Sequence, residues 1–459
     1  MLTHPWRHTP IVALCCAVAI TLVTGTAAAD AQTAEPPDDR ASVYGHPSGS
    51  RIWLSGQLNL ISQFHGAFSS PYEGPNSFRA APEQALSRVW TLYTGVKVGS
   101  RMELLADIES AGGHGLSSAL GLAGFTNLDV VRNPSLGPAP YAARVLAHWT
   151  IPLTGDEEPV TPTALSLAPR LPANRIDVRA GKLSLVDSFD VNTVLSDSHL
   201  QFTNWTVANN GAYDYAADTR GYTVGVTLDY VRTRWTLRGA EALMPRVANG
   251  SRLDWNVRRA HADNIELELR PTSRFTARVL GYANHADMGS YQEAIDQFHA
   301  HLVPVPDIVA VRKQRRIKTG AGFNVEYAFP RIVRLAARLG WNEGHNESFA
   351  YTEVNGTVQG GGDVSGELWN RRHDRLGIAI VSNALSAAHR EYLRLGGLGF
   401  LLGDGSLAYG RESLVEVYYT AQVWHGVSIA GGMQHVANPG YNTNRGPVSV
   451  GSVRLHVDF

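Results

Sequence analysis

Hydrophobic and polar residues alternate along most of the chain after residue 50. In the clearest run Tyr222, Val224, Val226, Leu228 and Tyr230 alternate with Thr223, Gly225, Thr227 and Asp229. Successive side chains of a β-strand point to opposite faces, so this pattern predicts a strand with one apolar and one polar face. Comparable runs recur at 265–270, 323–329, 333–341, 415–423 and 446–459. The alternation predicts an all-β chain.

The lengths of the runs and of their connections indicate how the strands are arranged. About 16 runs of roughly ten residues can be counted, the length that a tilted strand needs to cross the apolar core of a membrane. Short connections fall at 99–100, 231–232, 271–273, 330–332 and 425–426, and long ones at 63–86, 111–141, 185–219, 244–262, 285–317 and 383–413. Short periplasmic turns that alternate with long outer loops are typical of a transmembrane antiparallel up-and-down β-barrel.

Two stretches qualify this picture. The final run, 446–459, carries an apolar row that ends on Phe459, and an aromatic residue at the end of such a row is typical of the membrane interface of a barrel. The stretch 152–174 is rich in proline and is long where a short turn is expected. We interpret it as a local insertion on the periplasmic side.

The polar faces of the predicted strands are heavily charged. They carry Arg179, Lys182, Arg234, Arg238, Arg278, Arg334, Arg338 and Arg454 together with Asp229, Glu266, Glu268, Glu326 and Glu416. Unpaired charges inside a soluble barrel would be very costly, whereas a lumen filled with water accommodates them. The competing interpretation is a soluble sandwich whose charges face solvent, and it requires a second sheet to cover each apolar face.

The N-terminus has the features of a signal for export. Arg7 precedes an apolar stretch at 11–24, and small residues at 27–31 offer cleavage sites. We predict a cleaved signal peptide at 1–31, a flexible periplasmic leader at 32–50 and the barrel at 51–459. The predicted location is the outer membrane of a Gram-negative type of cell, with membrane lipid around the barrel.

Composition narrows the class of partner. The net charge of −1 gives no support for a nucleic-acid partner. The only two cysteines, Cys15 and Cys16, lie in the predicted signal peptide, so the mature chain has no cysteine for a disulfide. An exported chain without disulfides is consistent with a barrel that closes on its own hydrogen bonds.

Several ordered segments resemble one known family. They are EYLRLGGLGFLLGDGSLAYGRE at 391–412, NPGYNTNRGPVSV at 438–450, RLHVDF at 454–459, GKLSLVDSFDVNT at 181–193 and NWTVANNGAYDYAADTRGYTVG at 204–225. Together they are similar to the carbohydrate-selective porin (OprB) family, from about residue 60 to the C-terminus. The resemblance implies a 16-stranded outer-membrane barrel through which sugars diffuse inward. The stretches 152–174 and 285–317 match nothing in that pattern.

The chemistry of sugars suggests which residues narrow the pore. Sugars need hydrogen bonds to their hydroxyl groups and a flat apolar surface for their C–H faces, and conduction needs weak binding at several sites. The stretch 185–219 is long, polar and aromatic, and it follows the fifth strand as the third outer loop. Such a loop either folds inward and narrows the pore or lies on the surface, and the sequence leaves both positions open. The proposed constriction combines the wall residues Arg179 and Lys182 with Asp187, Asp190, Asn204, Trp205 and Tyr213 from this loop. In competing interpretations the acids and the asparagine cap turns, and Trp205 anchors the rim.

Other functions lack their motifs. No serine lies in a nucleophile-elbow sequence, and no Gly-Lys-Ser/Thr phosphate loop is present, so no enzymatic activity is predicted. Asp296, His299 and His301 do not have the spacing of a metal motif, so no metal or cofactor is expected. A plugged receptor would need a domain ahead of the first strand. A general, non-selective porin is the alternative to a sugar channel, and both a monomer and a trimer remain open.

A loop helix is expected at 383–396, with Asn383 as its N-cap and Gly396 as its stop.

Overall fold

The computed structural model describes residues 42–45, 50–130, 136–330 and 332–459. The chain divides into two units, Met1–Pro36 and Pro37–Phe459. The first unit, which contains the predicted signal peptide, lies outside the described residues, as does the predicted leader up to residue 41 and at 46–49.

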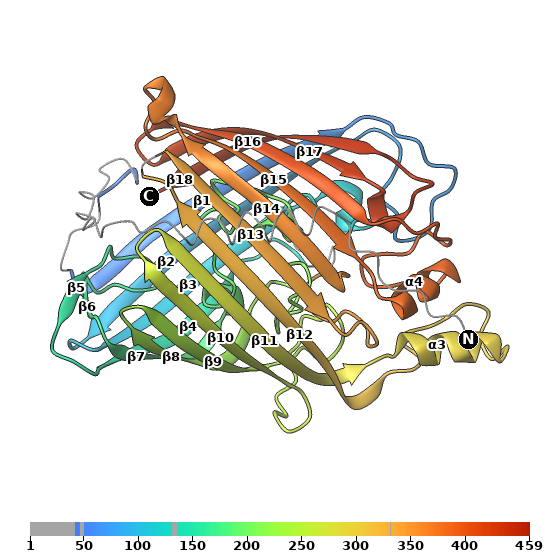
Figure 1. The fold of residues 1–459 in the computed structure, drawn as a ribbon, viewed down its shortest axis with the longest axis horizontal. Helices are drawn as coiled ribbons and strands as arrows, with labels where there is room; N and C mark the ends of the chain where they lie inside the picture. The colour runs from blue at the N-terminus through green and yellow to red at the C-terminus, as the bar shows by residue number, and fades with distance from the viewer. Residues whose placement is uncertain (1–41, 46–49, 131–135, 331) are drawn as a thin grey trace. The chain divides into compact units, whose positions relative to one another are not determined.

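Within the described residues sixteen strands close into one antiparallel barrel (Figure 1). These strands are β1 (Ile52–His65), β2 (Glu83–Val98), β3 (Met102–Gly113), β4 (Tyr141–Pro152), β7 (Arg175–Leu183), β8 (Thr223–Arg232), β9 (Trp235–Leu243), β10 (His261–Thr272), β11 (Phe275–Met288), β12 (Lys313–Ala328), β13 (Val333–Asn342), β14 (Gly356–Ser365), β15 (Arg375–Ala384), β16 (Glu412–Trp424), β17 (Val427–Ala437) and β18 (Val448–Asp458). Each pairs with its neighbours in sequence order, and β1 pairs with β18 to close the ring. The predicted fold class is confirmed.

The ring closes where the ends of the chain's barrel segment meet. Gln57 lies opposite Asp458, and the pairing continues to His65 opposite Val450. The amide of Gly56 donates to the carbonyl of Phe459 at 2.6 Å, and the Phe459 ring lies where a side chain at Gly56 would be. The absence of a side chain at Gly56 therefore makes room for the aromatic residue that ends the apolar row.

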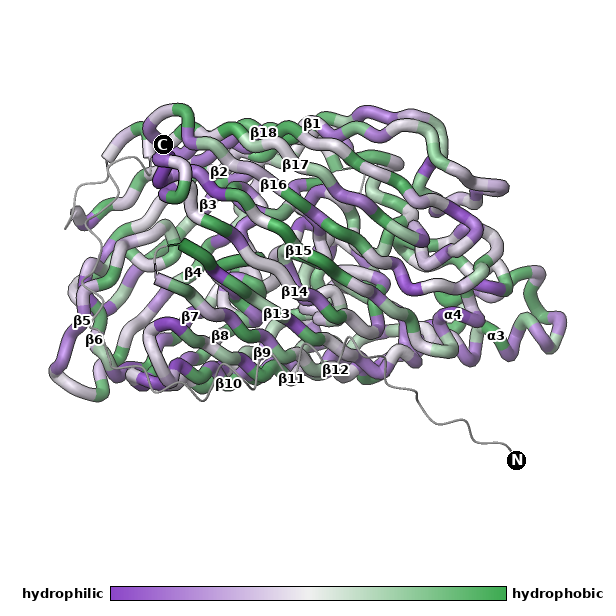
Figure 2. The backbone as a smooth tube through the Cα atoms, turned by 45° about the horizontal axis from the view of Figure 1, so that its top comes forward, coloured by the Kyte–Doolittle hydropathy of each residue, from purple (hydrophilic) through white to green (hydrophobic). Residues whose placement is uncertain are grey.

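The outward face of the barrel is apolar and the inward face is polar, as the alternation predicted. On β10 Ile265 is 58% exposed on the outer surface, whereas its inward neighbour Glu266 is 1% exposed. Hydrophobic positions recur along the strands of the wall in Figure 2. In the part of the chain that is described, no helix combines the length and the hydropathy needed to cross a membrane.

Short and long connections lie at opposite ends of the barrel, which we call the turn end and the loop end. Only residues 233–234 join β8 to β9 at the turn end, and only 273–274 join β10 to β11. The insertion at 153–174 also lies at the turn end and contains a two-stranded sheet of β5 (Glu157–Pro159) and β6 (Arg170–Pro172). Figure 1 shows β5 and β6 at the end of the barrel opposite to α3 and α4.

The helices of the described residues all belong to connections. They are α2 (Trp205–Ala208), α3 (Tyr291–His299), α4 (Ala387–Arg394) and the 3-10 turns η1 (Leu116–Ala119), η2 (Leu185–Asp187), η3 (Gly366–Trp369) and η4 (Pro439–Tyr441). The helix expected at 383–396 is present as α4. Its N-cap is Ser386, whose hydroxyl accepts from the amide of His389, because Asn383 is still part of β15. Gly396 follows the helix with a φ of 90°, as expected of a glycine stop.

The interior differs from the expected open lumen. Arg338 and Lys318 point inward but are 0% exposed, because loops fold into the barrel and cover them. A charge at this depth needs a partner, and the inward-folded loops supply one to each of these side chains. The charged inner face is therefore largely a surface on which loops are held, and only part of it borders solvent.

Candidate functional site

The connection between β7 and β8, residues 184–222, occupies the interior of the barrel, and we call it the inner loop. Its residues 201–219 are buried without exception. Inside the loop, α2 begins at Asn204, whose side chain accepts from the amide of Thr206. Of the two positions that the sequence left open for this loop, the structure shows the inward one.

Carboxylates on the wall hold the inner loop by its backbone. Each accepts a hydrogen bond from one or more backbone amides of the loop, and no loop side chain is required for this contact. The bonds run from the amide of Asp190 to Glu266 at 2.7 Å, from Thr193 to Glu326 at 2.8 Å, and from Thr203 and Asn204 to Glu416 at 2.7 and 3.2 Å. Such charge-assisted bonds are among the strongest hydrogen bonds in proteins.

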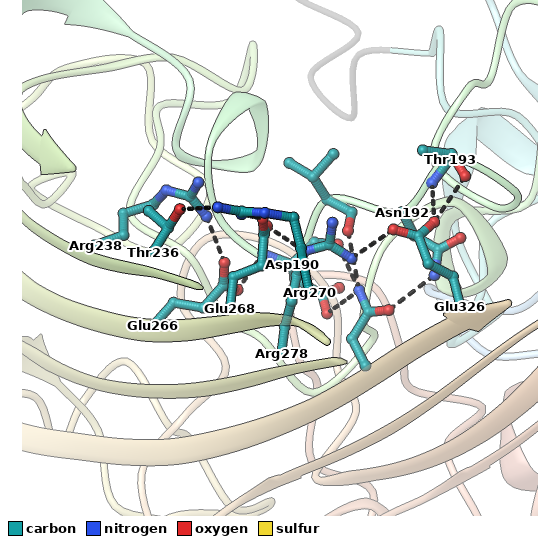
Figure 3. Close-up of polar contacts among 12 residues, drawn as sticks. Asp190, Asn192, Thr193, Thr236, Arg238, Glu266, Glu268, Arg270, Arg278 and Glu326 are labelled. Atoms are coloured by element: carbon teal, nitrogen blue, oxygen red, sulfur yellow. Dashed lines mark hydrogen bonds and ion pairs between the residues drawn. The ribbon is translucent and has the colours of Figure 1, made fainter. Parts of the chain in front are cut away.

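Arginines of the wall neutralise the same carboxylates (Figure 3). Arg238 contacts Glu266 at 2.6 Å, and Arg278 bridges Glu268 and Glu326 at 2.8 Å each. The Nε of Arg338, which is fully buried, lies 2.9 Å from the carboxylate of Asp190. Alternating charges across the wall therefore fix one side of the inner loop, and free space lies on another side of it.

That free space is a cavity of about 270 Å³ between the inner loop and strands β2, β3 and β4. Tyr141, the first residue of β4, and Glu109, near the end of β3, both line the cavity, so it lies toward the loop end of the barrel. Its lining also includes Tyr93, Asp129, Arg144, Asp187, His199, Trp205, Tyr215, Arg220, Tyr222 and Tyr351.

One side of the cavity is a network of hydrogen-bonding groups. Arg144 on β4 binds both carboxylate oxygens of Asp187 at 2.7 Å and reaches Asp107 at 3.2 Å. The hydroxyl of Tyr222 donates to Glu109 at 3.1 Å. Burial and the charge of Glu109 raise the pKa of Tyr222 well above its ordinary value, so this hydroxyl remains a donor at physiological pH. These groups match the donors and acceptors of a polyhydroxylated solute.

Another part of the cavity lining is aromatic. The rings of Trp205 and Tyr351 stack with a centroid distance of 5.4 Å and an interplanar angle of 4°, and Tyr215 packs on Tyr351 at 4.8 Å. The indole nitrogen of Trp205 donates to the carbonyl of Asn127 at 2.8 Å, so its orientation is fixed. A fixed aromatic surface and a polar network in the same lining offer both kinds of contact that a sugar ring needs.

A histidine and an aspartate add a titratable pair to the lining. His199 Nε2 lies 3.5 Å from Asp129 Oδ1, and the His199 ring stacks on His456 at 5.4 Å. Burial lowers the pKa of His199, but the hydrogen bond and the charge of Asp129 outweigh it and raise the pKa to about 8. Burial likewise opposes ionisation of Asp129, yet its bonds to His199 and Asn59 lower its pKa. This part of the cavity is therefore positively charged on His199 at neutral pH.

The structure separates the seven residues that the sequence suggested for the constriction. Asp187 and Trp205 line the cavity. The ammonium group of Lys182 lies 5.7 Å from the ring of the lining residue Tyr222 and donates to the carbonyl of Ala142. Arg179 lies lower on the wall, where it pairs with Asp229 at 3.4 Å.

The other three residues lie in the packed side of the inner loop and are absent from the cavity lining. Asp190 pairs with Arg338, and the hydroxyl of Tyr213 donates to Asn264 at 2.8 Å. Asn204 caps α2 and is 0% exposed. Their contacts serve to hold the loop in place.

Several lining residues were missed by the sequence reasoning. Arg144 could have been noticed, because the strand pattern at 142–151 puts it on a polar face. Tyr351 comes from the connection between β13 and β14, and no local signal indicates that this connection reaches the inner loop. Tyr215 is likewise one of several aromatic residues in the loop, and only the folded structure separates those that line the cavity from those that pack beneath it.

Elsewhere in the described part of the chain, His261, Asp263 and His285 form a group that could hold a metal ion. Both imidazoles have Nε2 3.6 Å from the same carboxylate oxygen of Asp263. Their rings, however, are stacked at 4.3 Å with an interplanar angle of 13°. A ligand nitrogen points within its ring plane, so two parallel stacked rings do not converge on one ion, and we derive no metal chemistry from this group.

Comparisons with known proteins agree with the barrel. The sequence profile of the carbohydrate-selective porins of the OprB family matches residues 76–459. The high-pH structure of Pseudomonas putida OprB is similar with a TM-score of 0.68 and 12% identity, over 89% of this chain and 94% of that chain. No curated protein gave a significant match to the sequence.

Weaker similarities involve further porin structures. The low-pH structure of Pseudomonas putida OprB has a TM-score of 0.46 and 9% identity, over 88% of this chain and 92% of that chain. A mutant of Rhodopseudomonas blastica porin has a TM-score of 0.43 and 8% identity, over 89% of this chain and all of that chain. The profile match runs from before β2 to the final residue, and on this evidence the chain belongs to the OprB family of carbohydrate-selective porins.

Proposed function

We propose that the protein lets monosaccharides and small oligosaccharides diffuse passively through its barrel, by way of the cavity between the inner loop and β2, β3 and β4. The observation that carries this proposal is that one cavity lining contains two kinds of surface. The lining includes the stacked rings of Trp205 and Tyr351 and a network built on Arg144, Asp187 and Glu109. Weak contacts of both kinds favour entry of a sugar without trapping it.

Near balance of charge in the lining supports a neutral solute. The lining carries three positive groups and four carboxylates. They are Arg144, Arg220 and protonated His199, and Glu109, Asp129, Asp187 and Asp218. The excess of only one negative charge gives the cavity little net attraction for a small ion. Of the residues chosen from sequence we retain Asp187 and Trp205 as solute contacts, with Lys182 beside them at the rim.

Swelling of liposomes that contain the purified protein tests the proposal. Sugar entry should saturate with concentration and be faster than entry of an amino acid of similar size. Trp205→Leu should raise the sugar concentration at which entry is half-maximal about fivefold. The reason is that an aromatic contact contributes about 1 kcal/mol of binding free energy. Phe202→Leu is the matched control, because Phe202 is a buried aromatic residue of the same loop that packs on Tyr418 and does not line the cavity.

The alternative is a general porin, which would sort solutes by size alone. In that case swelling rates would fall smoothly with solute size, entry would not saturate, and Trp205→Leu and Phe202→Leu would behave alike. That result would contradict sugar selectivity while leaving a diffusion channel. Absence of swelling for every solute would contradict the channel itself.

We also propose that export removes residues 1–31, that residues 32–50 form a flexible leader, and that membrane lipid surrounds the barrel at 51–459. The small residues at 27–31 support this processing site. Mass spectrometry of the protein purified from outer membranes should give a mature N-terminus within or just after this stretch. A mature protein that retains the apolar stretch 11–24 would contradict the proposal.

A further inference from the structure

The insertion between β4 and β7 is the feature that sequence and fold leave unexplained. Pro152, which ends β4, lies directly opposite Arg175, which begins β7. A two-residue turn could therefore join these strands, as it does between β8 and β9. The chain instead inserts residues 153–174, which form the small β5–β6 sheet and return to the wall.

At Leu167 the insertion contacts the inner face of the barrel wall. Its amide donates to the carboxylate of Glu103 at 3.0 Å, and its side chain is 3% exposed. It lies against Gly95, where an added methyl group would meet both Leu105 and Leu167 at 2.8 Å. The glycine therefore leaves the space that the leucine of the insertion fills.

Leu167 completes an apolar layer that spans three strands. Gly95 on β2 lies opposite Leu105 on β3, and Leu105 lies opposite Leu146 on β4. Leu105 and Leu146 are 2% and 6% exposed. We call these three residues together with Leu167 the apolar layer.

The apolar layer lies immediately beside the cavity. One inward position closer to the loop end, the same strands carry Tyr93, Asp107 and Arg144, which pair with one another across β2, β3 and β4. Tyr93 and Arg144 line the cavity. Inward positions along a strand are two residues, or about 7 Å, apart, so the cavity meets the apolar layer at its turn side.

A second polar row follows on the far side of the apolar layer. There Glu103 lies opposite His148, and His148 lies opposite Arg179. Along this part of the inner wall the inward-facing positions are therefore polar, then apolar for one layer, then polar again. A hydrophobic constriction of this kind impedes hydrated solutes because water is poorly held between apolar walls.

We propose that the insertion 153–174 is the inner size-selecting element of the pore, and that Leu167 is the residue that narrows the route below the cavity. This inference rests on the proposed passage of sugars through the cavity. The element is attached at the turn end by Arg175, which donates to the carbonyl of Pro172 at 3.0 Å, and by the bond of Leu167 to Glu103. It thereby adds a second determinant of solute size on the periplasmic side of the aromatic and polar cavity.

Conductance in planar bilayers and liposome swelling with a series from mono- to tetrasaccharide test the inference. Leu167→Ala should raise single-channel conductance and extend entry to a larger sugar. The side chain of serine is close in size to that of alanine but is polar. Leu167→Ser should therefore conduct more than Leu167→Ala if the apolar character of Leu167 excludes water in addition to its bulk. Leu171→Ala, a buried leucine of β6 outside the apolar layer, is the matched control and should leave both properties unchanged.

A second variant keeps the test decisive if removal of Leu167 impairs folding. Replacement of 153–174 by Asn-Gly joins the paired residues Pro152 and Arg175 directly and removes the whole element. Its conductance and size limit should increase at least as much as those of Leu167→Ala. Folding of each variant is checked by the shift in electrophoretic mobility on heating that folded barrels show.

The outcomes separate this inference from the proposed function. If the wild type admits sugars and both the alanine and the turn variants show its conductance and its size limit, the insertion is a brace and the inference is wrong. If the wild type admits no sugar and only the variants do, the insertion closes the route in the wild type, and both the proposed function and the size-selecting role are wrong. If neither wild type nor variants admit any solute, the proposed function itself fails.

Discussion

Buried carboxylates on the barrel wall hold the inner loop by its backbone amides, and their negative charge makes these bonds strong. Glu416 is the clearest case, because it accepts from the amides of Thr203 and Asn204 and from the hydroxyl of Thr203. An amide in its place would turn an NH₂ group toward donors. Unsatisfied buried donors cost about 1–3 kcal/mol each.

Glu416→Gln should therefore loosen the inner loop while leaving the barrel closed. We expect faster proteolytic cleavage between residues 196 and 210 and larger fluctuations of single-channel current. Glu241→Gln is the control, because Glu241 is exposed on β9. Equal protease resistance of Glu416→Gln and wild type would contradict the role of the carboxylate.

Because of the pair of His199 and Asp129, the charge of the cavity lining and the stability of the inner loop depend on pH. The raised pKa of His199, about 8, means that their ion pair stabilises the loop in full below about pH 6.5 and is lost as the pH rises through 8. The lining loses one positive charge over the same interval. The cation-to-anion permeability ratio should therefore increase between pH 6 and pH 9.

His199→Gln tests this assignment. The variant should lack the step near pH 8, whereas His435→Gln, at an exposed position of β17, should retain it. Reversal potentials in a salt gradient measure the ratio at each pH. A step of unchanged size in His199→Gln would assign the titration to another group.

At the scale of elements, α3 and α4 form a small unit at the loop end of the barrel. Tyr291 of α3 stacks on His389 of α4 at 4.1 Å and packs on Tyr392 at 5.2 Å. Neither helix is long enough to be stable alone, so each depends on this contact. The hydroxyl of Ser386 caps α4, and a lost cap costs about 1 kcal/mol.

Ser386→Ala should raise amide hydrogen exchange in α3 and α4 together by about fivefold and leave the strands unchanged. Ser386→Asp retains a side-chain acceptor at the cap and should exchange as the wild type does. Hydrogen exchange read by mass spectrometry resolves both helices. Faster exchange confined to α4 would mean that the two helices do not form one unit.

The sequence did not indicate how far the inward loops fill the interior of the barrel. The alternation correctly predicted which strand face is polar, because that pattern is local. It could not say that loop backbone occupies the space beside Glu266 and Glu326, since these contacts join residues more than seventy positions apart. For the same reason Asp190 and Tyr213, chosen as solute contacts, lie among packed side chains.

At the scale of the whole molecule, the family and the closed barrel indicate a transport channel of the outer membrane rather than an enzyme. A lysine placed on the outward apolar band should therefore destabilise the barrel more strongly the closer it lies to the middle of the membrane. Leu267 lies near the middle of β10 and is exposed outward, whereas Asp263 lies closer to the end of the same strand. The two outward positions are four residues, or about 13 Å, apart.

Leu267→Lys should lower the free energy of unfolding in lipid by about 2–4 kcal/mol, and Asp263→Lys by no more than about 1 kcal/mol. Urea titration of protein folded into lipid vesicles measures both values. The contrast tests where the band lies, because a soluble protein would tolerate lysine at either position. Equal effects of the two substitutions would contradict a membrane around β10.

The sequence by itself determined the barrel, because alternation, strand length and the order of short and long connections are properties of neighbouring residues. It also marked 185–219 as a loop that could enter the barrel and 152–174 as an exception. Only the tertiary structure decided that the loop enters, which residues border the cavity and what the insertion touches. Arg144, Trp205 and Tyr351 come together from a strand and two loops, and Leu167 of the insertion lies against Gly95 of β2. Such contacts depend on barrel closure, which brings distant residues together and leaves no trace in the local pattern.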